Sequence, residues 1–256
     1  MTVHVGVLGL GEAGARFAAD LAAAGADVAG FDPAVPAPSG VRAAATAADA
    51  AAGAEVVLSL NAAAVALAVA TGVVPALRGG TVYADLNTTS PAAKKQIARA
   101  VGESGALFAD VALMAPVPEA GLQTPCLVAG PGADAYVAFC AAFGVPVEPA
   151  GFEPGAAALR KLVRSVFMKG LAAAAIEALA AAEAADLRAD AYLDIAATLA
   201  GADAALLDRL VTGSELHAAR RVHEMDDAAA LLRTLGVEPR VSEAAAGWLR
   251  ELEHAG

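Results

Sequence analysis

The feature that most constrains this chain is a glycine-rich turn near its start. The apolar run Val3–Leu8 precedes the turn, and the alanine-rich stretch Arg16–Ala24 follows it with helix-forming residues. The turn fits the pattern G-x-G-x-x-G, and a strand–turn–helix order is the context in which this pattern indicates dinucleotide binding. Glycine turns in an ordinary α/β domain are the alternative. The predicted dinucleotide-binding residues of the turn are Gly9, Leu10, Gly11, Glu12, Ala13 and Gly14.

Each glycine has its own physical role in this prediction. Gly9 allows the tight turn from strand to helix, and Gly11 leaves room for a pyrophosphate to approach the backbone. Gly14 lets the helix pack closely on the strand. The N–H groups of the first helical turn then face the phosphates, and the helix dipole favours their negative charge.

A second apolar run, Ala26–Phe31, ends at Asp32. A carboxylate at this point binds the adenosine ribose hydroxyls, so it favours NAD over NADP, whose 2′-phosphate would meet a negative charge. No lysine or arginine follows until Arg42, which is the candidate partner of a 2′-phosphate. We predict NAD as the cofactor, with NADP as the alternative. A simple turn residue before Pro33 is the other interpretation of Asp32.

Composition excludes several classes of protein. The 256 residues are enough for one large or two modest domains, and a net charge of −11 without a basic tract argues against a nucleic-acid partner. Hydrophobic content is 58%, but much of it is alanine, and the apolar stretch 61–77 is interrupted by Gly72 and Pro75. Cys126 and Cys140 lack the spacing of a metal site, so no metal is predicted. With no basic signal-peptide region before the first strand, we expect a soluble, cytoplasmic protein with no membrane partner.

Strand and helix patterns alternate as far as residue 154. The strands are predicted at 55–60, 81–86, 106–111, 125–129 and 145–149, and the helices at 62–77, 91–101 and 133–143. This alternation predicts an α/β fold whose dinucleotide-binding domain, residues 1–154, has a Rossmann-type doubly wound parallel sheet. Leu60 and Asn61, at the end of one strand, are included in the predicted cofactor-binding set.

After Pro154 the pattern is helical. We predict one long helix over 156–187, followed by shorter helices at 189–199, 203–210, 215–235 and 242–254, with glycines such as Gly201 and Gly213 between them. Residues 155–256 are therefore predicted to form a smaller all-α domain that begins with the long helix and serves substrate binding and dimerisation. The expected partners are a small-molecule substrate and a second copy of the chain in a homodimer.

The start of the long helix has a cluster of cations. Lys161, Arg164 and Ser165 share one side of a helix by their spacing. Clustered cations in an acidic chain suggest an anionic ligand, and neighbouring positive charge with desolvation lowers the pKa of a lysine enough for a general base. A solvated helix face is the alternative.

Several segments resemble, in the same order, the motifs of the β-hydroxyacid dehydrogenase family, which includes 3-hydroxyisobutyrate and 6-phosphogluconate dehydrogenases. They are the fingerprint Val7–Gly14, the segment Asp85–Pro91 beside the nicotinamide, the start of the substrate loop at Phe108–Asp110, and the helix from Gly155, which places Lys161 at the catalytic lysine. Glu177 stands sixteen residues after that lysine, where the family commonly has an acidic residue.

This resemblance implies hydride transfer between a substrate carbinol carbon and nicotinamide C4. Lys161 would take the hydroxyl proton during oxidation and return it during reduction. Asn87 and Thr88 would position the nicotinamide end or the substrate, which puts Asn87 in both the cofactor and the substrate set. Arg164 is the predicted anion anchor, because its planar fork suits a carboxylate or phosphate. The predicted substrate-binding residues are Asn87, Thr88, Met114, Arg164 and Ser165.

The chain also departs from the family. The family's S-G-G after Asp110 is replaced by Leu113–Pro118, and its asparagine four residues past the lysine is Ser165. Its C-terminal K-D pair falls at Met225–Asp227, without the lysine. These features help to hold a substrate carboxylate in relatives, so we expect a different substrate. The pattern resembles a less characterised, 6-phosphogluconate-dehydrogenase-like branch. The residues that would compensate are Arg164, His217, Arg220, Arg221 and His223; for the last four, a solvated helix face is the alternative.

The sequence therefore predicts an NAD(P)-dependent dehydrogenase or reductase that acts on the CH–OH group of a small hydroxy acid or on a related carbonyl compound. Two alternatives remain open. One is an imine reductase-like enzyme, and the other is a dinucleotide-binding sensor without turnover.

Overall fold

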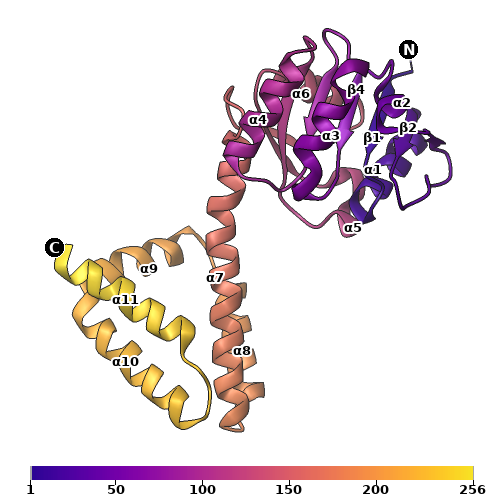
Figure 1. Cartoon of the computed structure of the whole chain (residues 1–256). Coiled ribbons are helices and arrows are strands. Elements are labelled where there is room, and N and C mark those ends of the chain that lie inside the picture. Colours follow the sequence, from indigo (N-terminus) through magenta and orange to yellow (C-terminus); the bar gives the residue numbers. More distant parts are fainter. Residues whose placement is uncertain (1, 256) are drawn as a thin grey trace. The chain divides into compact units, whose positions relative to one another are not determined.

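The computed structural model describes residues 2–255, which divide into two compact units (Figure 1). One unit ends at Arg164 and the other begins at Ser165. Helix α7 (Ala156–Ala184) begins just after Pro154 and belongs to both units, because the boundary between the units falls inside this continuous helix.

The first unit is built on an eight-stranded sheet. Its strands, in spatial order, are β3 (Arg42–Ala43), β2 (Asp27–Phe31), β1 (His4–Leu8), β4 (Val56–Ser59), β5 (Val82–Asp85), β6 (Leu107–Leu113), β7 (Cys126–Ala129) and β8 (Val147–Pro149). The strands from β3 to β6 all run parallel. The chain adds β2 and β3 on one side of β1 and then crosses back to add β4 on the other side, so the strand order reverses between β1 and β4. The predicted Rossmann-type α/β fold is confirmed, and its ligand crevice is expected at this reversal.

One part of the sheet differs from the predicted parallel order, because β7 runs antiparallel to β6. The segment between them forms only the short helix α5 (Val117–Ala120) and the 3₁₀ turn η3 (Gly121–Gln123), both of which pack on α1 (Glu12–Ala23). The chain therefore stays at the edge where β6 ends, and β7 must start there. A parallel β7 would need a crossover back to the opposite edge.

Helices cover both faces of the sheet (Figure 1). One core layer contains Phe17 of α1 and Tyr136 of α6 (Ala133–Ala142). The opposite layer is formed by α2 (Ala47–Ala51), α3 (Ala66–Val73) and α4 (Pro91–Gly102), with Ile97 at its centre. Strands β4 and β5 are buried along their whole length, which explains why they are apolar up to their last residues, Ser59 and Asp85.

The predicted helix over 62–77 is broken into three pieces. The α-helical part, α3, is flanked by the 3₁₀ turns η1 (Ala63–Val65) and η2 (Val74–Ala76). Pro75 has no N–H to continue the helix, so the last turn tightens. Strand β3 and helices α2 and α5 were not predicted, because each is too short to show a periodic pattern.

The second unit is helical, and no strand lies among the described residues after Pro149. After α7 come α8 (Arg188–Ala200), α9 (Ala204–Leu216), α10 (Ala218–Thr234) and α11 (Arg240–Ala255). Helices α10 and α11 pack together, and α9 contacts both. The predicted break at Gly213 was wrong, since α9 continues through it. A Cβ at Gly213 would lie 2.9 Å from Arg221 Nη2, so this glycine serves close packing instead.

Helix α7 is long and apolar enough to cross a membrane by length and composition alone. Long helices of soluble proteins pass the same test, so one such helix is weak evidence for a membrane protein. Only 11% of its apolar window is buried, and Val166, Phe167 and Ile176 are exposed. Their exposure leaves a large apolar face on the second unit.

A carboxylate on α7 holds the start of α11. Glu177 accepts hydrogen bonds from the backbone N–H groups of Val241 at 2.7 Å and Ser242 at 2.8 Å, and from the Ser242 hydroxyl at 2.7 Å. Burial acts to raise the pKa of Glu177, but the hydrogen bonds outweigh burial, so this pKa lies below its ordinary value. The bonds satisfy N–H groups that α11 cannot pair by itself.

We expect Glu177→Ala to destabilise the helical unit by about 1–2 kcal/mol, because it leaves these N–H groups unpaired. Since the pKa is lowered in the folded state, the contribution is present above the ordinary pKa near 4.5 and is lost as the pH falls through the folded-state pKa. Urea unfolding at several pH values, followed by the emission of the single tryptophan, Trp248 on α11, measures it.

The matched control is Glu183→Ala. Glu183 lies on the same helix and forms an exposed ion pair with Arg188 at 3.3 Å, so its loss should cost less than about 0.5 kcal/mol. Equal effects of the two substitutions would contradict the capping role of Glu177.

Candidate functional site

The glycine turn has three different environments at its three glycines. Gly9 has a φ of +95°, and a Cβ there would lie 2.4 Å from the backbone oxygen of Leu60. A Cβ at Gly14 would lie 1.9 Å from the backbone oxygen of Gly9, so α1 packs directly on the turn. At Gly11, by contrast, a Cβ would meet no atom of the described chain within 4 Å. The backbone is therefore open at the one glycine where a pyrophosphate would approach.

This opening belongs to a cavity of about 380 Å³. The three glycines line it together with predicted cofactor residues from the same turn and from the end of β4, namely Glu12, Ala13, Leu60 and Asn61. Leu10 contributes differently: its side chain is buried in the core, and only its backbone faces the turn. Helical hydrogen bonding in α1 starts with Ala15 N–H to Gly11 O, so the earlier N–H groups of the first turn can bind phosphate oxygens.

Asp32 connects the glycine turn to the loop after β2. One carboxylate oxygen accepts the Leu10 N–H at 2.8 Å, and the other accepts the N–H groups of Ala34 at 2.8 Å and Val35 at 3.0 Å. Burial acts to raise the pKa of Asp32, but these backbone bonds outweigh burial and hold it below its ordinary value. Asp32 is thus both a turn residue and an ionised carboxylate on the cavity, with acceptor capacity left for ribose hydroxyls.

Arg42 does not share this cavity. It lines a separate one with His4 and Asp27, which are the first residues of β1 and β2, at the opposite edge of the sheet. Among the described residues that line the glycine cavity, none is a lysine or an arginine, whereas Glu12 and Asp32 are both present.

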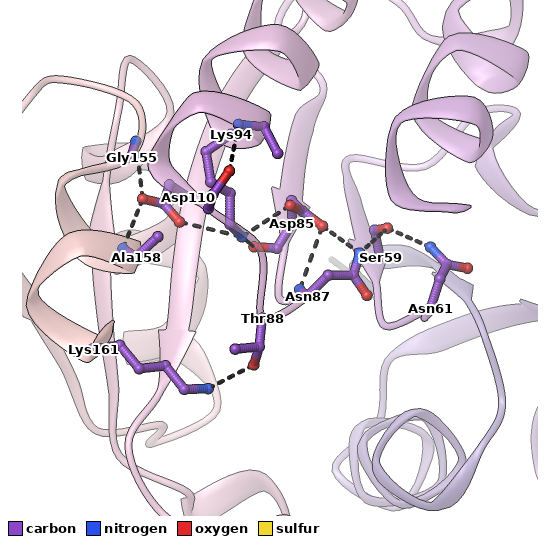
Figure 2. Close-up of polar contacts among 12 residues, drawn as sticks. Ser59, Asn61, Asp85, Asn87, Thr88, Lys94, Asp110, Gly155, Ala158 and Lys161 are labelled. Carbon is purple, nitrogen blue, oxygen red and sulfur yellow. Dashed lines mark hydrogen bonds and ion pairs between the residues drawn. The ribbon is translucent and has the colours of Figure 1, made fainter. Parts of the chain in front are cut away.

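The structure brings Lys161 and Thr88 together, although they are far apart in the sequence (Figure 2). Lys161 Nζ donates a hydrogen bond to Thr88 Oγ1 at 2.9 Å, and Thr88 follows the carboxyl end of β5. One turn further along α7, Arg164 Nη1 donates to the backbone oxygen of Met114 at 3.4 Å. Ser165 comes next on the helix and falls in the second unit.

Asn87 is held in a polar network at the carboxyl ends of β4 and β5 (Figure 2). Its amide nitrogen donates to Ser59 Oγ at 3.1 Å and to Asp85 Oδ1, and Asn61 donates to the same Ser59 oxygen at 2.7 Å. Within the described chain, Asn87 Oδ1 is buried without a hydrogen-bond partner. A fixed side chain with an unused acceptor suits a ligand amide or hydroxyl.

Sequence reasoning gave no individual role to four residues of this region, namely Ser59, Asp85, Lys94 and Asp110. Asp85 and Asp110 entered only as ends of the segments that resemble the family's motifs. All four are buried: Ser59 and Asp85 end β4 and β5, Asp110 lies in the middle of β6, and Lys94 lies on the adjacent helix α4. The signal that points to Ser59 and Asp85 is a polar residue at the carboxyl end of two consecutive apolar strands, and the signal for Asp110 is a lone carboxylate inside an apolar strand.

The second cation cluster lies in the helical unit. Arg221 Nη1 donates to Ser214 Oγ at 2.6 Å, and Arg220 lies 3.7 Å from Glu224 in an exposed ion pair. Both arginines line a cavity of about 620 Å³ beside Trp248. These contacts fit the solvated interpretation for Arg220 and a packing role for Arg221.

Comparison with known families agrees with this geometry. Residues 4–137 match the NAD binding domain of 6-phosphogluconate dehydrogenase, and residues 182–252 match a domain of unknown function (DUF1932). No curated protein matches the chain at a significant level.

Three solved structures illustrate the similarity. A conserved hypothetical protein from Sinorhizobium meliloti 1021 is 33% identical, with 98% of this chain and 88% of that chain covered and a TM-score of 0.64. A conserved protein of unknown function, described as structurally similar to 3-hydroxyacid dehydrogenases, is 25% identical over 97% of each chain, with a TM-score of 0.65. A reductive aminase from Aspergillus terreus, in complex with NADPH and ethyl levulinate, shares the fold at 20% identity, covering 100% and 95%, with a TM-score of 0.83.

The glycine environments give a matched set of substitutions. Gly11→Ala should fold with unchanged stability, since its Cβ meets no described atom, but should weaken NADH binding at least about tenfold by blocking the pyrophosphate. Gly14→Ala should destabilise the first unit, because its Cβ collides with the Gly9 backbone. Fluorescence titration with NADH and thermal unfolding measure the two effects.

Gly72→Ala is the control for these substitutions. Gly72 lies in α3 and has no described atom near its Cβ position, so alanine should leave NADH binding unchanged and stability equal or slightly higher. Full NADH affinity in a folded Gly11→Ala variant would show that the cofactor does not approach this glycine.

Proposed function

Because the chain belongs to the family of oxidoreductases that share the NAD-binding domain of 6-phosphogluconate dehydrogenase, we propose that it transfers hydride between a nicotinamide cofactor and a small hydroxy acid or related carbonyl compound. The observation that supports this function best is the contact of Lys161 with Thr88 at the carboxyl edge of the sheet. A lysine at this edge is where a substrate hydroxyl beside the nicotinamide would need a proton acceptor.

In this proposal Lys161 is the general acid and base. The bound dinucleotide supplies the hydride acceptor or donor. Lys161 Nζ takes the proton from the substrate hydroxyl during oxidation and returns it to the carbonyl oxygen during reduction. The bond to Thr88 Oγ1 fixes the direction of the amine, and Thr88 keeps its own hydroxyl proton to donate to the substrate.

Other residues orient the two ligands. Asn87 holds the nicotinamide end or the substrate through its unused acceptor. Arg164 holds a carboxylate or phosphate of the substrate, because its bond to Met114 uses only one of its N–H groups. Met114 and Ser165 complete the proposed substrate set.

We infer that NAD is the preferred cofactor. The glycine cavity has two carboxylates, Glu12 and Asp32, and a 2′-phosphate near Asp32 would be repelled. The solved relatives include one with NADPH and an imine reductase variant from Myxococcus stipitatus with NAD⁺, at 20% and 21% identity, so they show the fold and leave the choice to the chain's own residues. Two free, buried cysteines are consistent with the cytoplasm as the proposed location.

The test is turnover of the wild type with NAD and NADP in parallel, on 3-hydroxy acids, phosphorylated hydroxy acids, carbonyl compounds and imines. Lys161→Met should lower kcat by about 10²- to 10⁴-fold while NADH affinity stays within about threefold, because only the proton transfer is lost. The matched control is Lys169→Met, which removes an exposed lysine from the same helix and should leave kcat unchanged.

Three outcomes would change the proposal. Turnover that survives Lys161→Met would remove the lysine as the acid and base. Turnover on imines alone would replace the CH–OH substrate with an imine. NADH binding without any turnover would favour the sensor function.

We propose that the functional form is a homodimer joined through the helical unit. From Gly170 to Ala182 the only charged side chain of α7 is Glu177, which is engaged on α11. Large exposed apolar side chains lie along this helix and its neighbours, including Val166, Phe167, Ile176 and Leu193. An uncharged apolar face is complementary to itself, so a second copy of the chain would bury it.

Light scattering should therefore give the mass of two chains. Ile176→Glu places a charge on the exposed face and should shift the protein to one chain, while Ile176→Val should keep two. A wild-type mass of one chain at micromolar concentration would contradict the dimer.

A further inference from the structure

A buried lysine lies between two buried carboxylates beside the candidate site. Lys94, on α4, is 1% exposed, and its Nζ lies 2.9 Å from Asp85 Oδ2 and 3.2 Å from Asp110 Oδ1. It also donates to the backbone oxygen of Asp85 at 2.6 Å. Asp85 and Asp110 are register partners on the adjacent strands β5 and β6. One ammonium group therefore joins α4 to the end of β5 and the middle of β6.

Stability does not explain why this cluster is ionic. Burying three charged groups costs several kcal/mol for each ion, and apolar side chains of the same volume are often equally stable or more stable. The cluster also contains two carboxylates for one ammonium. A function that depends on its exact geometry is therefore worth seeking among the groups that it holds.

The second oxygen of Asp110 holds the start of α7 (Figure 2). Asp110 Oδ2 accepts the backbone N–H groups of Gly155 at 3.0 Å and Ala158 at 3.1 Å. A carboxylate at a helix N-terminus satisfies unpaired N–H groups and meets the positive end of the helix dipole. Gly155 is equally fixed, since a Cβ there would lie 2.8 Å from the backbone oxygen of Pro91 at the start of α4.

Both ends of the Lys161–Thr88 contact depend on this cluster. Lys161 lies one helical turn beyond Ala158, whose N–H is bound by Asp110. Thr88 lies in the loop directly after Asp85. The Lys94 ammonium group binds both the backbone oxygen and the side-chain carboxylate of Asp85. Lys94 thus connects the helix that bears the lysine to the loop that bears its partner.

We propose that Lys94 and Asp110 are positioning residues that set the place of Lys161 opposite Thr88. This inference rests on the proposed role of Lys161 as acid and base. Neither residue touches substrate or cofactor. Asp110 fixes the first turn of α7, and Lys94 fixes Asp110 relative to Asp85, so that the amine of Lys161 is delivered to Thr88 without rearrangement. Misplacement by about 1 Å is enough to lower a rate by about 10²-fold.

The sharpest comparison uses two double variants with the same buried charge. In Lys94→Met/Asp110→Asn the amide oxygen still accepts from Gly155 and Ala158, and the amide nitrogen can turn toward Asp85. In Lys94→Met/Asp110→Ala the acceptor for α7 is absent. Each variant keeps only the Asp85 charge, which equals the net charge of the wild-type cluster, so the two differ only in the amide group that caps α7 and can pair with Asp85.

Two readouts are taken on both variants. The first is kcat beside the dissociation constant of NADH. The asparagine variant should keep kcat within about fivefold of the wild type, and the alanine variant should lose about 10²-fold, with NADH affinity unchanged in both. The second is trace acylation of lysines with acetic anhydride, read by mass spectrometry as the ratio of Lys161 to the exposed Lys169. This ratio should match the wild type in the asparagine variant and rise toward 1 in the alanine variant.

Acylation does not require turnover, so it separates this inference from the proposed function. An unchanged ratio and an unchanged kcat in the folded alanine variant would overturn the positioning role, whatever reaction the protein catalyses. If the wild type proves inactive, a ratio that still rises in the alanine variant would keep the positioning role and reject only the dehydrogenase.

Two further variants control for folding. Glu177→Ala also removes a carboxylate from a helix N-terminus, in the other unit, and should leave both readouts unchanged. Ala158→Pro removes one N–H donor to Asp110 and leaves every charge in place, and proline is tolerated in a first helical turn. It should lower kcat about tenfold and raise the Lys161 ratio; full wild-type values in both readouts would equally overturn the proposal.

Discussion

Two pieces of backbone approach each other so closely at the start of α1 that no side chain fits between them. The backbone of Gly9 packs directly against the carbonyl group of Leu60, and the backbone of Gly14 packs directly against that of Gly9. This approach decides where β1 ends, where α1 begins and how far β4 lies from both. Because contact is so close there, the backbone of the turn stays open only at Gly11, which lines the cavity at the sheet reversal.

The polar side chains of the candidate site already have most of their hydrogen-bond partners within the protein. Asp32 is occupied by three backbone N–H groups, and Asn87 by Ser59 and Asp85. Asp32 keeps acceptor capacity on the cavity, and Asn87 keeps a buried carbonyl oxygen that has no hydrogen-bond partner in the described chain. A site built in this way pays little reorganisation when a ligand arrives, because its dipoles already point where they are needed.

Local sequence patterns predicted the features that depend on neighbours in the chain. The strand–turn–helix unit and the start of α4 at Pro91 are of this kind. The roles expected of Lys161 and Thr88 came instead from resemblance to a family, and their contact was not predicted, because the two residues are 73 positions apart and no local pattern connects them. Lys94 was missed because a lysine next to Lys95 on a helix is typical of a solvated face, and its two partners come from different strands.

The direction of β7 and the helical place of Gly213 were also beyond local patterns. In the first case the decisive contact is the packing of α5 on α1, and in the second it is the guanidinium of Arg221 over the glycine. Both are tertiary contacts that override a correct local tendency.

The two edge strands of the sheet have a consequence for how the protein avoids aggregation. β3 offers only two residues, one of them the charged Arg42, and β8 offers three, ending in a proline that has no N–H to donate. Edge strands of this kind give an incoming strand too few hydrogen bonds to extend the sheet. Short edge strands thereby protect this apolar, alanine-rich chain from forming fibrils by strand pairing between molecules.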